Sequence, residues 1–178
     1  MVVYALDETN VKYESNNRCS WSPVAQPPIL EKNGCGRGIN LVGSTSILNN
    51  HHTVVDVYSS RKSITSVEIK SHIEYLIQIN PNKKIVIFLD NARTHTSKLM
   101  QSFYQDKKDI LSVMFLPKYS PKMNPQEHIW NHYKAELYKP MARKSIYELV
   151  YDTQIIFSEL NERSDKICSL AYARNYLV

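Results

Sequence analysis

The stretch that most constrains the fold is Lys83 to Ser97, KKIVIFLDNARTHTS. Ile85 to Leu89 is an unbroken apolar run rich in β-branched residues, with lysines before it and Asp90 directly after it. Such a run is typical of a strand buried on both faces, in the middle of a sheet with helices above and below. Open α/β sheets place ligands in the crevice beyond the carboxyl ends of their strands. We therefore expect the carboxylate of Asp90 to be displayed at such a crevice.

The flanking sequence predicts three leading strands in an antiparallel meander, followed by two strands that alternate with helices. The expected strands are 2–13, 39–48, 51–58, 85–89 and 110–116, and the expected helices are 63–78, 94–105, 125–138 and 144–160. This order fits an α/β fold with a mixed, ribonuclease-H-like five-stranded sheet flanked by helices. In that fold, acids from the first strand, the fourth strand and a later helix converge. A flavodoxin-like fold would alternate from the start, which the leading meander opposes.

Length and composition predict one domain of ordinary globular character. Within the 178 residues we expect a catalytic domain over 1–140 and a helical extension over 141–178 that packs on it. No run approaches the ~20 apolar residues of a membrane span, and no secretory signal is visible. Cys19, Cys35 and Cys168 form no C-x-x-C pair, so we expect reduced thiols. The expected location is the cytoplasm, in contact with the nucleoid if the source is prokaryotic.

The positive charge is concentrated around Asp90. The whole chain carries a net charge of +5, and residues 90–144 hold ten Lys/Arg against five Asp/Glu. A basic surface beside a cluster of carboxylates suits a polyanionic substrate such as nucleic acid.

Three acids are placed so that the expected fold can bring them together. Asp7 lies in or at the end of the first strand, Asp90 follows the fourth, and Glu127 lies in the first turn of the helix after Pro125. Carboxylates about 5 Å apart repel by roughly 3 kcal/mol per pair at an effective dielectric of about 20. A cluster of this kind is therefore unfavourable unless it is protonated or holds cations. Hard oxygen ligands suit Mg²⁺ or Mn²⁺, and two such ions about 4 Å apart support in-line phosphoryl displacement. Taken singly, each acid could equally be a cap or a turn former.

Two longer motifs carry a family resemblance. FLDNARTHTS, followed by FLPKYSPKMNPQEHIWNHYK, closely resembles the DDE-type catalytic domain of Tc/mariner-superfamily transposases, in particular their prokaryotic insertion-sequence branch. The opening LDET is similar to the first-acid strand of that family, and Trp21-Ser22-Pro23 is similar to its Trp-x-Pro-x-Gly stretch, where Ala25 replaces the usual glycine. The matching positions of the second motif include Pro117, Tyr119, Ser120, Pro121, Asn124, Pro125, Glu127 and Trp130.

The resemblance implies metal-dependent DNA cleavage and strand transfer in the transposition of an insertion sequence. The implied catalytic residues and metal ligands are Asp7, Asp90 and Glu127, holding two Mg²⁺ or Mn²⁺ ions. The implied DNA contacts are Asn91, His95, Lys118, Lys122 and Lys134. The implied structural positions are Trp21, Pro121, Asn124, Pro125 and Trp130. The expected partners are double-stranded DNA, a second copy of the chain in a homodimer, and a helix-turn-helix segment encoded separately or upstream.

Some alternatives stay open at this point. Glu8 is the runner-up first ligand, although a regular strand points it away from Asp7. His128 and His132 have zinc-site spacing, but the sequence between them lacks the glutamate of the metalloprotease motif. The functional rivals are a nuclease of the same fold without strand transfer, and a catalytically silent DNA-binding remnant.

Overall fold

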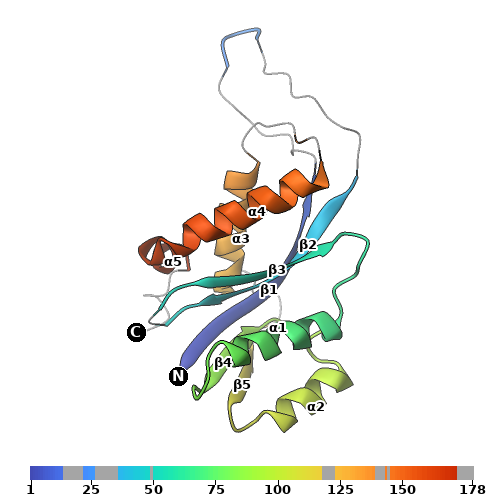
Figure 1. The fold of residues 1–178 in the computed structure, drawn as a ribbon, viewed down its shortest axis with the longest axis vertical. Helices are drawn as coiled ribbons and strands as arrows, with labels where there is room; N and C mark the ends of the chain where they lie inside the picture. Colours follow the sequence, from blue (N-terminus) through green and yellow to red (C-terminus); the bar gives the residue numbers. More distant parts are fainter. Residues whose placement is uncertain are drawn as a thin grey trace.

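A mixed five-stranded sheet organises the protein (Figure 1). The structure, a computed structural model, describes residues 1–13, 22–26, 36–48, 50–117, 123–138, 143 and 145–171. The strands are β1 (Val2–Lys12), β2 (Gly38–Ser46), β3 (Thr53–Ser59), β4 (Ile85–Leu89) and β5 (Leu111–Phe115), in the spatial order β3-β2-β1-β4-β5. The pairs β1–β2 and β2–β3 are antiparallel, whereas β1–β4 and β4–β5 are parallel. The predicted arrangement of three antiparallel strands followed by parallel strands is confirmed.

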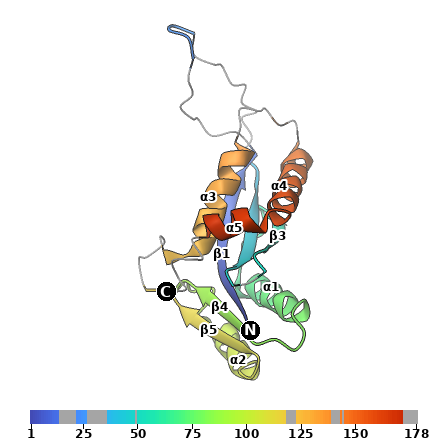
Figure 2. The ribbon, with the colours of Figure 1, turned by 90° about the vertical axis from the view of Figure 1, so that its left-hand side faces the viewer.

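Helices cover both faces of this sheet. They are α1 (Ser66–Gln78), α2 (Lys98–Asp106), α3 (Pro125–Leu137), α4 (Ile146–Asn161) and α5 (Ser164–Leu170). Even-numbered residues of β1 such as Tyr4 and Leu6 pack with α1 and α2, while Val11 and Tyr13 pack with α3, α4 and α5. Figures 1 and 2 show α1 and α2 near β4 and β5, with the other three helices gathered toward the opposite end of β1.

Several helices begin a few residues later than the sequence predicted, because capping residues set their first turns. Helix α1 starts at Ser66 and not at 63, since Thr65 caps it in a capping box with Glu68. Helix α2 starts at Lys98 and not at 94, because Ser97 accepts a hydrogen bond from Met100 N and the preceding residues form turns. A side-chain cap of this kind fixes the helix start that apolar periodicity leaves open.

Strand β4 is buried on one face only, so the expectation of burial on both faces was wrong. Ile85, Ile87 and Leu89 are fully buried against α1 and α2, whereas Val86 and Phe88 are only partly buried. Among the described residues, the apolar side chains of α3 and α4 join a cluster with β1 and β2, while Val86 and Phe88 pack only against a smaller cluster that includes Val3 and Ala5.

Residues beyond 140 pack onto the same sheet. Leu149, Phe157 and Ile167 share one apolar cluster with Trp130 and Tyr133 of α3. The division into a catalytic domain over 1–140 and an extension over 141–178 stays a prediction. Among the described helices, none combines the length and the apolar character needed to cross a bilayer.

Ala25 has the backbone conformation of a glycine. Its φ of 64° lies in the left-handed region, within a turn in which Gln26 N donates to Pro23 O at 3.1 Å. A side chain in this region costs about 1–2 kcal/mol, which glycine avoids. The chain thus keeps the conformation for which a glycine is suited while carrying an alanine.

Candidate active site

The parallel pairing of β1 with β4 sets two of the three acids next to each other. Val2 lies opposite Ile85, and Ala5 lies opposite Phe88. Continuing this register by two residues places Asp7 opposite Asp90, just beyond the paired segment. Val3, Ala5, Val86 and Phe88 share one face of the sheet, and alternation along each strand assigns Asp7 and Asp90 to that same face. It is the face on which α3 lies.

Hydrogen bonds from two strands hold the start of α3 against this position. Asn124 caps α3 by accepting from Gln126 N, and its Nδ2 donates to Leu6 O at 3.2 Å, one residue before Asp7. From β2, Thr45 Oγ1 donates to Gln126 Oε1 at 2.6 Å. Both tethers are buried, and Glu127 follows them directly. The third acid is therefore carried by a helix start that is fixed to β1 and β2.

Gly43 allows α3 to approach this closely. It lies opposite Asp7 in the β1–β2 register. A Cβ atom at Gly43 would fall 2.6 Å from Cζ2 of Trp130 and 2.9 Å from Nε2 of Gln126, inside van der Waals contact. Trp130 is fully buried, with edge contacts to Tyr133 and Phe157, so its ring has little room to move. The absence of a side chain at Gly43 thus sets the distance between α3 and the strand of Asp7.

Asp7 stands in an environment that disfavours its charge. Burial raises the pKa of Asp7 to about 8, and repulsion from the carboxylates of Glu127, Glu8 and Asp90 adds to the increase. Each of these acids is therefore near enough to act on Asp7. Without a bound cation, Asp7 is mainly protonated at neutral pH.

Asp90 and Glu8 meet through a buried histidine. His95 Nδ1 lies 2.7 Å from Asp90 Oδ1, and His95 Nε2 lies 3.1 Å from Glu8 Oε1. Burial alone would lower the pKa of His95, but the hydrogen bonds and charges of Asp90 and Glu8 outweigh it and raise the pKa to about 10. The same contact with His95 holds the pKa of Asp90 below its usual value. His95 is thus a buried cation between two carboxylates.

The donor set fits a hard divalent cation, although its side chains are not gathered on one point. Asp7, Asp90 and Glu127 offer carboxylate oxygens only, which suit Mg²⁺ and Mn²⁺. The pKa of Asp7 is raised mainly by burial, and the neighbouring carboxylates add to the increase. In the described part of the chain, no three His, Cys, Asp or Glu side chains are grouped so as to hold a metal ion. Asp90 accepts hydrogen bonds from His95 and from Ala92 N instead.

The other predicted site residues fall into three groups. Asn124, Pro125 and Trp130 are buried at α3, and their structural roles stay predictions. Asn91 Nδ2 donates to Leu116 O at 2.5 Å and links the ends of β4 and β5, while Lys134 is partly buried on α3. The remaining four, Trp21, Lys118, Pro121 and Lys122, lie outside the described residues.

His95 differs from its predicted surroundings. The sequence analysis placed His95 in a helix over 94–105 and as a contact to DNA, but the side chain is fully buried and precedes α2. Both ring nitrogens are engaged by carboxylates. Its role as a DNA contact stays a prediction, one that requires these hydrogen bonds to open.

Sequence reasoning missed the residues that assemble the site. These are Gly43, Thr45 and Gln126, which set the position of α3, and the contact of Glu8 with His95. An isolated glycine within a predicted strand signals a close approach, so Gly43 left a trace in the sequence. The pairing of Glu8 with His95 left none, because it joins residues that are distant along the chain.

The fold and the three acids define a class: a ribonuclease-H-like domain with carboxylates from β1, the end of β4 and the start of α3 on one face. Residues 2–149 match the DDE superfamily endonuclease family. The chain belongs to that family. Comparison with curated proteins found no match.

Solved structures with a similar fold are complexes and domains of the Mos1 transposase. The Mos1 paired-end complex with the left transposon end has a TM-score of 0.69 at 15% identity, covering 95% of this chain and 55% of that chain. A Mos1 mariner paired-end complex with Mn has a TM-score of 0.68 at 14% identity, covering 95% of this chain and 55% of that chain. The catalytic domain of Mos1 mariner transposase has a TM-score of 0.59 at 13% identity, covering 95% of this chain and 81% of that chain. The chain spans about half the length of the Mos1 chains in the paired-end complexes that it matches.

Proposed function

We propose that this chain is the catalytic domain of a transposase from the insertion-sequence branch of the Tc/mariner superfamily. It would cut a DNA strand at the end of the element to leave a 3′ hydroxyl, and then join that hydroxyl to target DNA. The observation that carries the proposal is the placement of the acids: Asp7 lies on β1, which pairs in parallel with the strand that ends before Asp90, and Asn124 ties the start of α3, which carries Glu127, to Leu6 O beside Asp7. The match over residues 2–149 to an endonuclease family supports it.

In this proposal Asp7, Asp90 and Glu127 hold the metal. Two bound Mg²⁺ or Mn²⁺ ions would stabilise both the attacking and the leaving oxygen of an in-line displacement at phosphorus. The protein would position these ligands through its strands and one helix start. The register of β1 and β4, continued beyond the paired segment, would bring Asp7 and Asp90 side by side, and the tethers at Asn124 and Gln126 would bring Glu127 toward them. The similar Mos1 structures include a paired-end complex with Mn and one with Mg.

Loading of this site should release a proton. Because the pKa of Asp7 is about 8 without metal, the group is protonated at pH 7 and must ionise to bind a cation. The raised pKa also makes the stability of the metal-free fold depend on pH. The contribution of Asp7 to the free energy of unfolding is fully present below its ordinary pKa of 3.8 and is lost as pH rises through about 8. Mn²⁺ titration calorimetry in two buffers of different ionisation enthalpy should show release of about one proton at pH 7 and much less at pH 9. Equal release at both values would contradict the assignment of Asp7.

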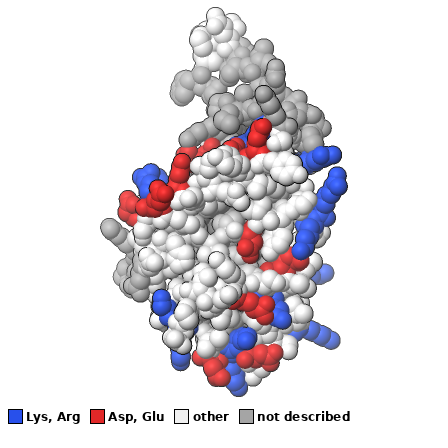
Figure 3. Space-filling view, in the orientation of Figure 1, with Lys and Arg blue, Asp and Glu red and all other residues white. Residues whose placement is uncertain are grey.

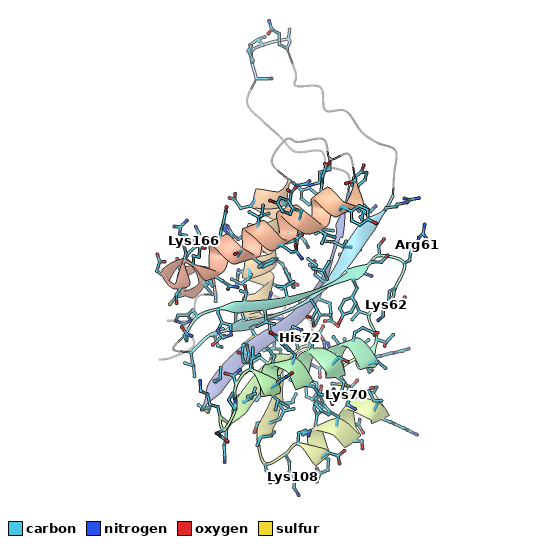
Figure 4. The ribbon with its side chains drawn as sticks, in the orientation of Figure 1. Arg61, Lys62, Lys70, His72, Lys108 and Lys166 are labelled. Carbon is cyan, nitrogen blue, oxygen red and sulfur yellow. The ribbon has the colours of Figure 1, made fainter. Side chains whose placement is uncertain are left out.

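The proposed partner is double-stranded DNA, bound as phosphate backbone. Lys and Arg side chains follow the right-hand edge of the face drawn in Figure 3, and Arg61 and Lys62 lie on that side (Figure 4). Lys62 there pairs with Glu68 at 2.9 Å. Recognition of the element ends would come from a helix-turn-helix segment outside these 178 residues, and the active complex would be a homodimer. The proposed location is the cytoplasm, at the nucleoid of a prokaryote.

Residues 1–178 alone should therefore bind DNA with little sequence preference. Phosphate contacts position a protein without specifying sequence, and counterion release makes log K fall with log salt by about 0.9 per phosphate. Lys118→Ala and Lys122→Ala should each weaken binding about equally for terminal-repeat DNA and for scrambled DNA of the same length. The measurement is a salt titration of binding to both DNAs. Tight, salt-tolerant preference for the terminal repeat would contradict the prediction.

Strand transfer is tested separately from cleavage. Terminal-repeat DNA with a ready 3′ hydroxyl is incubated with supercoiled target plasmid and Mg²⁺ or Mn²⁺, and joined products are resolved on a gel. Joined products support the transposase, nicking without joining indicates a nuclease of the same fold, and binding without either indicates a silent remnant. Either of the last two results would overturn the proposal.

A further inference from the structure

The contact of His95 with Asp90 leaves the two oxygens of that carboxylate in different situations. His95 Nδ1 at 2.7 Å and Ala92 N at 2.9 Å both bond to Oδ1. In the described part of the chain, the hydrogen bonds to this carboxylate all end on Oδ1. The Asp90 side chain is 53% exposed, so solvent and ligands can reach it. Oδ2 is therefore the oxygen left for a cation.

The ring of His95 is itself held in place. Glu8 Oε1 lies 3.1 Å from Nε2 on the far side of the ring, so a carboxylate faces each ring nitrogen. The turn that carries His95 is anchored from two helices, because Tyr104 on α2 donates to His95 O at 3.3 Å and Ser66 on α1 donates to Thr94 O at 2.7 Å. The side chain is fully buried, which excludes water as a competing partner. The ring thus has one orientation, set by Glu8 and by its own backbone.

We propose that Glu8 and His95 form a positioning pair, in which His95 fixes Oδ1 of Asp90 so that Asp90 binds a divalent cation through Oδ2 alone, and Glu8 fixes the His95 ring. This inference rests on the proposed function, since it concerns the same metal ligands. It gives Glu8 a role distinct from that of a ligand: Glu8 acts through His95, from the α1 and α2 face of the sheet. Groups that orient a metal ligand are typically worth 10–100-fold in metal affinity.

The chain offers a matched control for burial and geometry. His72 on α1 is also fully buried and lies 2.7 Å from Asp56 Oδ2 through Nδ1, while its Nε2 meets Ser44 Oγ at 2.8 Å (Figure 4). Asp56 lies opposite Val42, which lies opposite Glu8, so this second histidine–aspartate contact is two strands away from Glu8. Removing His72 should cost folding stability much as removing His95 does, without a metal ligand being involved.

The experiment measures Mn²⁺ affinity by electron paramagnetic resonance in the full chain, without DNA. His95→Ala should weaken Mn²⁺ binding by about 10–100-fold. His95→Asn keeps a donor near the position of Nδ1 and should recover part of that loss, and Glu8→Gln, which keeps the acceptor but not the charge, should have a smaller effect. His72→Ala should bind Mn²⁺ like the wild type. Circular dichroism confirms that each variant is folded, and His95→Asn replaces His95→Ala if the latter fails to fold.

The outcomes separate this inference from the proposed function. If folded His95→Ala binds Mn²⁺ with wild-type affinity while Asp90→Asn does not, the positioning pair is wrong and the metal site stands. If Asp90→Asn itself binds Mn²⁺ and cleaves DNA like the wild type, the proposed function fails. If His72→Ala weakens Mn²⁺ binding as much as His95→Ala does, the effect is general destabilisation and the positioning pair is overturned. In the metal-free protein, the His95 ring should also show a strongly hydrogen-bonded Nδ1 proton by NMR, which Glu8→Gln shifts and His72→Ala does not.

Discussion

Asp90→Asn should abolish Mg²⁺- or Mn²⁺-dependent DNA cleavage and leave the protein folded. The substitution keeps the shape of the side chain but removes the charge that a divalent cation requires. We expect a loss of at least about 10³-fold in rate, equivalent to about 4 kcal/mol of transition-state stabilisation. The fold should survive, because the amide oxygen that replaces Oδ1 can still accept from Ala92 N and His95 Nδ1, at a cost of about 1–2 kcal/mol.

The measurement is a time course of nicking of supercoiled plasmid, with thermal unfolding of the same preparation. Asp109→Asn is the matched control, since Asp109 is an exposed aspartate just before β5, at the opposite end of the parallel strands. It should cleave like the wild type. Cleavage by a pure Asp90→Asn preparation at the rate of Asp109→Asn would show that Asp90 holds no catalytic metal.

The fold could be predicted because its signals are local. The apolar run of β4 and the change from alternating to helical period after β3 each lie within one element. Open α/β sheets bind ligands in the crevice beyond the carboxyl ends of their strands. This general rule predicted that Asp90 would lie at an exposed strand end. Element boundaries were less accurate where a cap decides them, as at Thr65 and Ser97.

The site could be predicted only as a set of acids and not as a geometry. Alternation along β1 predicted opposite faces for Asp7 and Glu8, but it could not show that Glu8 reaches His95. The sequence analysis placed His95 within a helix because the sequence does not reveal that α2 begins only at Lys98. The tether of Gln126 to Thr45 likewise depends on how closely α3 approaches β2. Contacts between segments distant along the chain depend on packing distances that no local pattern encodes.

Gly43→Ala should damage both stability and cleavage, because one added methyl group meets the helix that carries Glu127. The new Cβ would lie 2.6 Å from Cζ2 of the fully buried Trp130 ring, so α3 must move away from β2. Overpacking of this kind costs about 2–3 kcal/mol of unfolding free energy. A shift of about 1 Å in a catalytic group can cost about 10²-fold in rate, so cleavage by the folded fraction should fall by about that factor.

Two further variants separate displacement of Glu127 from loss of stability. Gly38→Ala places a Cβ against Val11 O, opposite Lys12, at the far end of the same strand pair. It should destabilise the fold, while the folded fraction cleaves within a few-fold of the wild type.

Trp130→Phe removes the ring atoms that the new methyl group of Gly43→Ala would meet. The double variant Gly43→Ala/Trp130→Phe should therefore lose less unfolding free energy than the two single variants lose in sum, by about 1 kcal/mol or more. Chemical denaturation and plasmid nicking measure both effects. Strict additivity, or full cleavage by Gly43→Ala, would show that the position of α3 at Asp7 does not depend on the missing side chain of Gly43.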